Sequence, residues 1–270
     1  MSTSTIITAG GAFRICVEGP QDAPVLVFSN SLGTTLEMWD SQAVRFSKQW
    51  RILRYDTRGH GGSVVSPGPY GIEQLGGDVV ALLDALGIER ASFCGVSMGG
   101  LTGLWMGVNA PSRLDCLIVA NSAAKIGTAD AWLTRAELVR DKGTAAMADL
   151  AASAPSRWFT GAFVSAQADI VHQAKAWLGG VAPEGYAACC EALAQADLRT
   201  AIAGIAAPTL LIAGVSDSVT TVADAQAMQV AIAGSQLSEV PASHLSNLEA
   251  PREFNEALTA FLAGFRASRR

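Results

Sequence analysis

A serine between two glycines is the first feature of this sequence that could carry out chemistry. Residues 95–99 read Gly-Val-Ser-Met-Gly, which matches the pattern Gly-x-Ser-x-Gly, and they stand between an apolar run and a stretch with helical spacing. At a tight strand–helix turn the glycines allow the chain to fold sharply, and the hydroxyl of Ser97 is exposed for nucleophilic attack. A purely structural turn accounts equally well for the pattern alone, so Ser97 needs partners elsewhere in the chain.

A serine nucleophile requires a neighbouring base, and the chain contains three histidines. His60 lies in a glycine-rich loop, and His172 lies in an alanine-rich helical stretch. His244 follows the last apolar run, where a loop residue can reach over the carboxyl edge of a sheet. We therefore predict that His244 is the base.

The base in turn needs an acid that orients it. Asp217 follows the apolar run at 209–213 directly, and it stands between Ser97 and His244 in the chain. Asp115 is the weaker candidate because it begins an apolar run instead of ending one. The predicted catalytic residues are Ser97, Asp217 and His244.

Residues so far apart in the chain need a scaffold that brings the ends of several strands together. Six short apolar runs, bounded by Gly, Pro, Asn or Asp, are predicted strands, and segments with helical spacing alternate with them. This alternation predicts a parallel sheet with helices on both faces. The predicted strands are residues 25–28, 51–55, 92–94, 116–120, 209–213 and 237–240, and helices are predicted around 75–86, over 101–109 and after Pro251.

Residues 122–200 interrupt this alternation. The stretch contains no convincing strand, is rich in alanine, and reads as several helices inserted between two strands. We predict one α/β core formed by residues 1–121 and 201–270, with residues 122–200 as a helical cap.

The composition excludes several classes of function. Of the 270 residues 50% are hydrophobic and 16% are charged, which is enough apolar material for a large core. The net charge of −5 without a basic run argues against nucleic-acid binding. Five cysteines without a C-x-x-C pattern indicate neither a disulfide framework nor a zinc site. Because residues 1–11 lack a signal-peptide pattern and no apolar run could span a bilayer, we predict a cytoplasmic protein without membrane association.

The order Ser97, Asp217, His244 resembles that of the α/β-hydrolases, and the resemblance extends over residues 25–265. Residues 56–63, Asp-Thr-Arg-Gly-His-Gly-Gly-Ser, are similar to that family's largely structural loop D-x-R-G-x-G-x-S. Residues 247–251, Asn-Leu-Glu-Ala-Pro, are similar to the segment that follows its catalytic histidine. The resemblance implies an α/β-hydrolase fold, in which helices flank a mostly parallel central sheet and a helical cap is inserted.

Two positions depart from the family pattern. The loop after the first core strand usually reads His-Gly and carries an amide of the oxyanion hole, whereas residues 30–33 here read Asn-Ser-Leu-Gly. Because such a donor depends on backbone geometry, the expected oxyanion hole consists of the amides of Leu32 and Met98. The family often has proline four residues after the acid, where this chain has Thr221.

Residues 30–34 and 95–100 together resemble a narrower group, the 3-oxoadipate enol-lactonases of aromatic-compound catabolism (the β-ketoadipate pathway). This resemblance implies that a carboxylated lactone is opened to 3-oxoadipate through an acyl-enzyme on Ser97, with no metal or organic cofactor. A carboxylesterase or a carbon–carbon bond hydrolase with the same triad stays an alternative. A non-catalytic ligand-binding protein of this fold is a third interpretation, and an oligomer is compatible with all three.

An anionic substrate in an acidic protein calls for a local cation. Trp132 and Arg135 stand three residues apart in a helix-compatible stretch of the cap, so both can face one cleft. We predict that this pair binds the substrate, against the alternative that Arg135 is a solvated surface charge and Trp132 packs the cap. Arg157 and Trp158 form a similar candidate pair, for which we expect a structural role because adjacent residues of a helix point in different directions.

Overall fold

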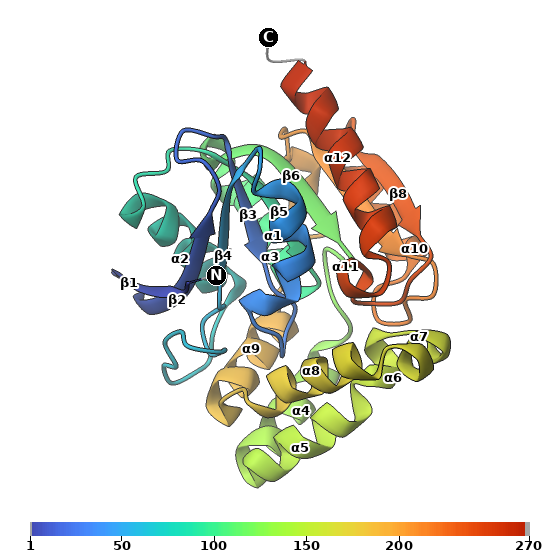
Figure 1. The fold of residues 1–270 in the computed structure, drawn as a ribbon. Coiled ribbons are helices and arrows are strands. Elements are labelled where there is room, and N and C mark those ends of the chain that lie inside the picture. Colours follow the sequence, from blue (N-terminus) through green and yellow to red (C-terminus); the bar gives the residue numbers. More distant parts are fainter. Residues whose placement is uncertain (1, 268–270) are drawn as a thin grey trace.

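The computed structural model describes residues 2–267, and an eight-stranded sheet forms its centre (Figure 1). The strand order is β1-β2-β4-β3-β5-β6-β7-β8. The pairs β1–β2 and β2–β4 are antiparallel, and all other neighbours are parallel. This sheet confirms the predicted fold class. The strands are β1 (Ser4–Thr8), β2 (Gly11–Glu18), β3 (Val25–Ser29), β4 (Arg51–Tyr55), β5 (Ala91–Val96), β6 (Leu114–Ala120), β7 (Thr209–Gly214) and β8 (Gln236–Val240).

The six predicted strands correspond to β3–β8, whereas β1 and β2 were not predicted. Strands β3 and β5 are buried along their whole length, and such strands appear in a sequence as continuous apolar runs. The residues of β1 are mostly exposed and include Ser4, Thr5 and Thr8, so no apolar run marks this edge strand. Its backbone pairing with β2, rather than its hydrophobicity, makes it a strand.

Helices cover both faces of the sheet, as parallel strands require. Helices α1 (Asp40–Phe46) and α12 (Pro251–Ala267) pack together on one face, and α2 (Ile72–Ala85), α3 (Met98–Asn109) and α10 (Val222–Ala231) lie on the other (Figure 1). The short helices are η1 (Leu36–Trp39), η2 (Pro111–Arg113), η3 (Ala201–Gly204) and α11 (Ser246–Glu249).

Six α-helices and the short helix η3 separate β6 from β7 in the chain, and the six α-helices lie together at one end of the sheet (Figure 1). Helix α4 packs against α9, and α5 packs against α8. This arrangement agrees with the helical cap expected for residues 122–200, and the division into core and cap stays a prediction. The six helices are α4 (Ala129–Lys142), α5 (Thr144–Ser153), α6 (Pro155–Trp158), α7 (Gly161–Ala166), α8 (Ala168–Gly179) and α9 (Pro183–Gln195).

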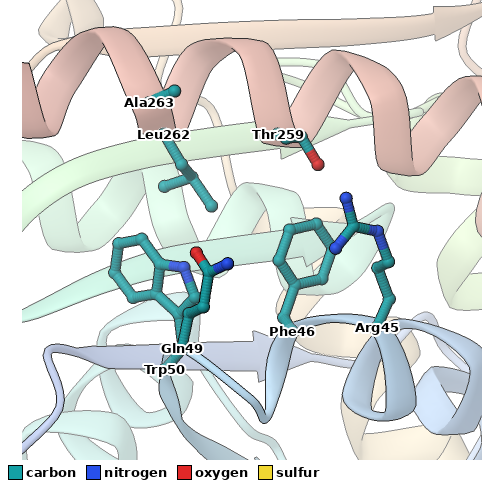
Figure 2. Close-up of a pocket in the computed structure, with 7 residues that line it drawn as sticks. All are labelled: Arg45, Phe46, Gln49, Trp50, Thr259, Leu262 and Ala263. Atoms are coloured by element: carbon teal, nitrogen blue, oxygen red, sulfur yellow. The ribbon is translucent and has the colours of Figure 1, made fainter.

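A cavity of about 190 Å³ lies between α1 and α12 (Figure 2). None of the predicted site residues lines it, and its walls offer neither a carboxylate nor a histidine as an acid or base. The lining residues are Arg45, Phe46, Gln49, Trp50, Thr259, Leu262 and Ala263. None of the helices between residues 2 and 267 is sufficiently long and apolar to cross a membrane.

Candidate active site

Ser97 lies at the turn between β5 and α3, in a backbone conformation that is rare for a residue with a side chain. Its φ angle is 57°, in the left-handed region. The surrounding structure holds this conformation: the Ser97 amide donates to the carbonyl of Ala120 at 3.0 Å, and the hydroxyl of Ser122 donates to the Ser97 carbonyl at 2.8 Å. A strained backbone conformation that surrounding hydrogen bonds stabilise is characteristic of turns at functional sites.

The two glycines of the pattern are required by close backbone contacts. A Cβ atom on Gly95 would lie 2.2 Å from the carbonyl carbon of Gly99, and one on Gly99 would lie 2.3 Å from the carbonyl oxygen of Ser29. Any side chain at either position would push α3 away from the sheet. Helix α3 consequently begins at Met98, three residues before the predicted start at Leu101.

Asp217 and His244 meet where β7 and β8 end. The Nδ1 atom of His244 lies 2.8 Å from Oδ2 of Asp217, and both residues are buried. The same Oδ2 accepts hydrogen bonds from Nδ2 of Asn121 at 3.0 Å and from the Thr220 hydroxyl at 2.9 Å. Its Oδ1 accepts from the amides of Val219 at 2.8 Å and Thr220 at 3.1 Å. The carboxyl group is therefore surrounded by five donors.

These donors decide the charge of Asp217. Burial alone would raise its pKa, but the hydrogen bond and charge of His244, together with Asn121 and the Thr220 amide, lower the pKa below its ordinary value. Asp217 is consequently a carboxylate near neutral pH, and it orients the His244 ring with a proton on Nδ1. The other ring nitrogen, Nε2, is left for chemistry.

Asn121 was not predicted from the sequence, although it contacts both Asp217 and the loop that carries His244. It follows β6 directly and has a φ angle of 44°. Its Nδ2 donates to Asp217 and also to the carbonyl of Ser243, at 3.0 Å in each case, and its Oδ1 accepts from the Ser246 hydroxyl. A polar residue directly after a predicted strand is the signal that could have found it.

The other two histidines lie away from this chemistry. His172 is exposed on α8. His60 is buried; its Nε2 accepts the amide proton of Gly33 at 2.9 Å, and its Nδ1 lies 3.2 Å from the carbonyl of Arg58. Burial lowers the pKa of His60, so the ring is neutral and can accept that hydrogen bond. The structural role expected for the loop of His60 thus extends to the neighbouring loop at Gly33.

The predicted oxyanion donors come from the start of a helix and from a loop. Met98 is the first residue of α3, where backbone amides have no partner within the helix. Leu32 follows β3, in a loop that Asn30 anchors: Nδ2 of Asn30 donates to the Tyr55 carbonyl at 2.8 Å, and its Oδ1 accepts from Nε1 of Trp39 at 3.0 Å. Asn30, which replaces the family's histidine, therefore fixes the loop that carries Leu32.

Five of the seven predicted site residues line a cavity of about 190 Å³, whereas Asp217 and Met98 do not line it. Ser97, His244 and Leu32 line its floor, and Trp132 and Arg135 from α4 line its wall. Arg157 and Trp158, for which we expected a structural role, line it too. Both residues lie at the end of α6, a single helical turn, and the backbone is extended only at Phe159 and Thr160 before α7 begins. The divergence of adjacent helical side chains therefore did not keep either residue from the cavity. The remaining lining residues are Ser31, Ile126, Gly127, Ala131, Leu178, Tyr186 and Val219.

Arg135 and Arg157 make no ion pair with an acidic side chain anywhere in the described part of the chain. The Arg135 guanidinium lies over the Trp132 ring, 4.8 Å from its centroid. Nη1 of Arg157 donates to the Ser153 hydroxyl at 3.2 Å. Burial, followed by the neighbouring charge of Arg135, lowers the pKa of Arg157. The two cations repel each other across a cavity that contributes no carboxylate.

Comparison with known proteins identifies the family to which the chain belongs. A family model described as alpha/beta hydrolase fold matches residues 24–251. The chain belongs to the alpha/beta hydrolase family. It is 48% identical to 3-oxoadipate enol-lactonase 2 of Acinetobacter baylyi, covering 97% of each chain, and 45% identical to 3-oxoadipate enol-lactonase 1 of the same organism, covering 94% of each. The crystal structure of the enol-lactonase from Burkholderia xenovorans superposes with a TM-score of 0.92 at 41% identity, covering 96% of this chain and 100% of that one.

The resemblance inferred from the motifs is thereby confirmed. The second departure from the alpha/beta hydrolase pattern also has a structural account. Thr221, which occupies the usual proline position, is the N-cap of α10, and it forms a capping box with Asp224. A capping residue starts this helix in place of a proline, and the acid loop at Asp217 ends at the same point. In residues 2–267 no group of three or more His, Cys, Asp or Glu side chains could hold a metal ion.

Proposed function

We propose that this protein hydrolyses 3-oxoadipate enol-lactone to 3-oxoadipate in aromatic-compound catabolism, with Ser97, Asp217 and His244 as its catalytic residues. The observation that carries the proposal is the cavity in which Ser97 and His244 face two arginines that have no acidic partner among the described residues. Such a cavity suits a substrate with an electrophilic carbonyl at one end and a carboxylate at the other. The relatives in Acinetobacter baylyi, which carry that enzyme's name, support it.

In the first half of the reaction the Ser97 hydroxyl attacks the lactone carbonyl. Nε2 of His244 takes the hydroxyl proton, and Asp217, 2.8 Å from Nδ1, stabilises the imidazolium. The negative oxygen of the tetrahedral intermediate receives hydrogen bonds from the amides of Leu32 and Met98. Loss of one such donor typically costs about 3–4 kcal/mol of transition-state stabilisation.

Collapse of the intermediate breaks the bond between the carbonyl carbon and the ring oxygen. The leaving group is an enolate, which is more stable than an alkoxide, and the proton on His244 neutralises it. The enol then becomes a ketone, so the tethered oxygen ceases to be a nucleophile and the ring does not close again. Water, deprotonated by His244, attacks the acyl-enzyme and releases the dicarboxylate product.

The cap residues supply recognition in this proposal. Arg135 and Arg157 bind the carboxymethyl carboxylate, and Trp132 forms an apolar wall beside it. The Trp132 ring is held by its Nε1, which donates to the carbonyl of Ile126 at 2.6 Å, and it stacks under the Arg135 guanidinium. A planar guanidinium matches a carboxylate with two parallel hydrogen bonds, and its positive charge is stabilised by the aromatic face.

The test is a substrate panel with the purified protein. Ring opening of the enol-lactone is followed by loss of its ultraviolet absorbance, beside p-nitrophenyl acetate as a simple ester and a vinylogous diketone as a carbon–carbon substrate. We expect the highest kcat/KM for the enol-lactone and none with Ser97→Ala. Equal kcat/KM for the enol-lactone and the ester would refute the assignment and favour a carboxylesterase, and preference for the diketone would favour a carbon–carbon hydrolase.

A fluorophosphonate probe separates catalysis from mere binding. We expect labelling of the wild-type protein and none of Ser97→Ala, and an unlabelled wild type would favour a ligand-binding role.

The expected cytoplasmic location, the lack of nucleic-acid and membrane association and the oligomeric state stay predictions.

A further inference from the structure

The loop that carries His244 is bound to the cap as well as to the core. The amide of Leu245 donates to the carbonyl of Trp158 at 3.0 Å, and the Ser243 hydroxyl lies 3.4 Å from the carbonyl of Arg157. Both acceptors belong to α6, whose side chains at these two positions line the catalytic cavity. The same cap segment therefore faces the substrate space and holds the histidine loop.

A half-buried carboxylate connects the two segments more strongly. Oε2 of Glu249 accepts the amide proton of Ser243, the residue before His244, at 2.8 Å. Oε1 of Glu249 accepts the amide proton of Thr160 at 3.0 Å and also a hydrogen bond from the Thr160 hydroxyl. Thr160 is the N-cap of α7, so Glu249 joins the cap to the residue adjacent to the base.

We propose that Glu249 is a positioning residue that fixes His244 by tying the cap segment 157–160 to the histidine loop. From the core, Asn121 holds the carbonyl of Ser243 and Asp217 holds the imidazole. Glu249 accepts the amide proton of Ser243 and is itself bonded to Thr160 of the cap segment. The carbonyl of Ser243 is thus held by Asn121 of the core, and its N–H group is held by Glu249. Occupation of the cavity against Arg157 is thereby coupled to the orientation of the base.

The requirement is for a carboxylate, because both oxygens act as acceptors. A glutamine has one acceptor oxygen and an NH₂ group that only donates. It would place a donor opposite either the Ser243 amide or the Thr160 donors. Hydrogen bonds between charged and neutral groups are also the stronger kind, and their loss on one side leaves backbone amides without their partner.

The experiment compares Glu249→Gln and Glu249→Ala with Glu253→Gln, which removes a surface carboxylate paired with Arg252 on α12. The substrate is p-nitrophenyl acetate, so the result does not depend on which lactone the enzyme takes. We expect kcat to fall about ten- to a hundredfold in both Glu249 variants, the scale of a misplaced catalytic group. The control Glu253→Gln should match the wild type in KM and in its labelling by fluorophosphonate.

A spectroscopic signature distinguishes positioning from general support. The proton on Nδ1 of His244, held by Asp217, gives a low-field resonance, and we expect it to broaden in both Glu249 variants. Wild-type kcat, or a wild-type resonance, in a folded Glu249 variant would overturn the proposal. If those variants do not fold, Thr160→Val and Thr160→Ser decide: a lowered kcat in the first and wild-type activity in the second support it, and equal activities refute it.

Fluorophosphonate labelling keeps this inference separate from the proposed substrate. A wild-type protein that is labelled on Ser97 but does not open the enol-lactone would refute the lactone assignment. The labelling rates of the Glu249 variants would then still test the role of Glu249.

Discussion

The two arginines of the cavity allow the proposed recognition of a carboxylate to be tested quantitatively. Replacing Arg135 or Arg157 by methionine keeps an unbranched side chain of similar reach and removes one positive charge. Because neither guanidinium has an acidic partner among the described residues, neither replacement leaves a protein carboxylate unpaired. A change in activity will therefore report the interaction with the substrate.

The size of the effect follows from the chemistry of the contact. A hydrogen bond to a charged group contributes about 1.5–3 kcal/mol, which corresponds to about ten- to a hundredfold in binding. Burial and then the charge of Arg135 lower the pKa of Arg157, so the two guanidinium groups repel each other, and the first replacement relieves this repulsion. We therefore expect about tenfold from each single replacement and about a hundredfold or more from the double variant.

The assay uses two lactones that differ only in the carboxylate. In α-angelica lactone a methyl group replaces the carboxymethyl group of 3-oxoadipate enol-lactone, whereas the ring and the enolate leaving group are the same. We expect the arginine variants to raise KM for the carboxylated lactone and to change kcat/KM for the neutral one by less than about twofold. Arg252→Met, on the exposed face of α12, is the control and should leave both lactones unaffected.

Equal losses on the two lactones would refute the recognition argument, because an effect common to both cannot come from the carboxylate. Wild-type kinetics of the double variant with the carboxylated lactone would refute it as well.

Three further predictions concern the groups behind the nucleophile. Asp217→Asn places an amide against the donors of Asn121 and Thr220, so the imidazole loses its partner and kcat should fall about 10³- to 10⁴-fold in steady-state assays. His60→Ala deprives the buried Gly33 amide of its acceptor. Urea unfolding should show a free energy of unfolding lower by about 1–3 kcal/mol, and kcat should fall equally for both lactones. Unchanged values would contradict the anchoring of the Leu32 loop. Because the folded pKa of Asp217 is lowered, its contribution to stability is complete above its unfolded pKa of about 3.9 and is lost as the pH falls through the folded pKa. The difference in unfolding free energy between wild type and Asp217→Asn should therefore narrow as the pH is lowered from about 5 to 3, and a constant difference would contradict the assigned charge.

Much of the scaffold could be predicted because its signals are local. The buried strands β3 and β5 are continuous apolar runs, and the Gly-x-Ser-x-Gly pattern stands at the turn from β5 into α3. The edge strand β1 and its neighbour β2 were not predicted, because their pairing is a backbone interaction that hardly depends on side-chain type. The start of α3 was misplaced for a related reason: the helix follows from the forced turn at Ser97 and not from apolar spacing.

Within the candidate site, the Gly-x-Ser-x-Gly pattern selected Ser97, and position after a predicted strand selected Asp217 and His244, because parallel strands end at one edge. The sequence could not determine which distant groups converge on them. Asn121, at 3.0 Å from Asp217, and Glu249, which bridges Ser243 and Thr160, are ordinary polar residues until the chain is folded. Arg157 enters the cavity because α6 ends there, a fact that no local pattern encodes. Side-chain type and order are properties of the chain, whereas hydrogen-bond partners and cavity walls are set by how remote elements pack.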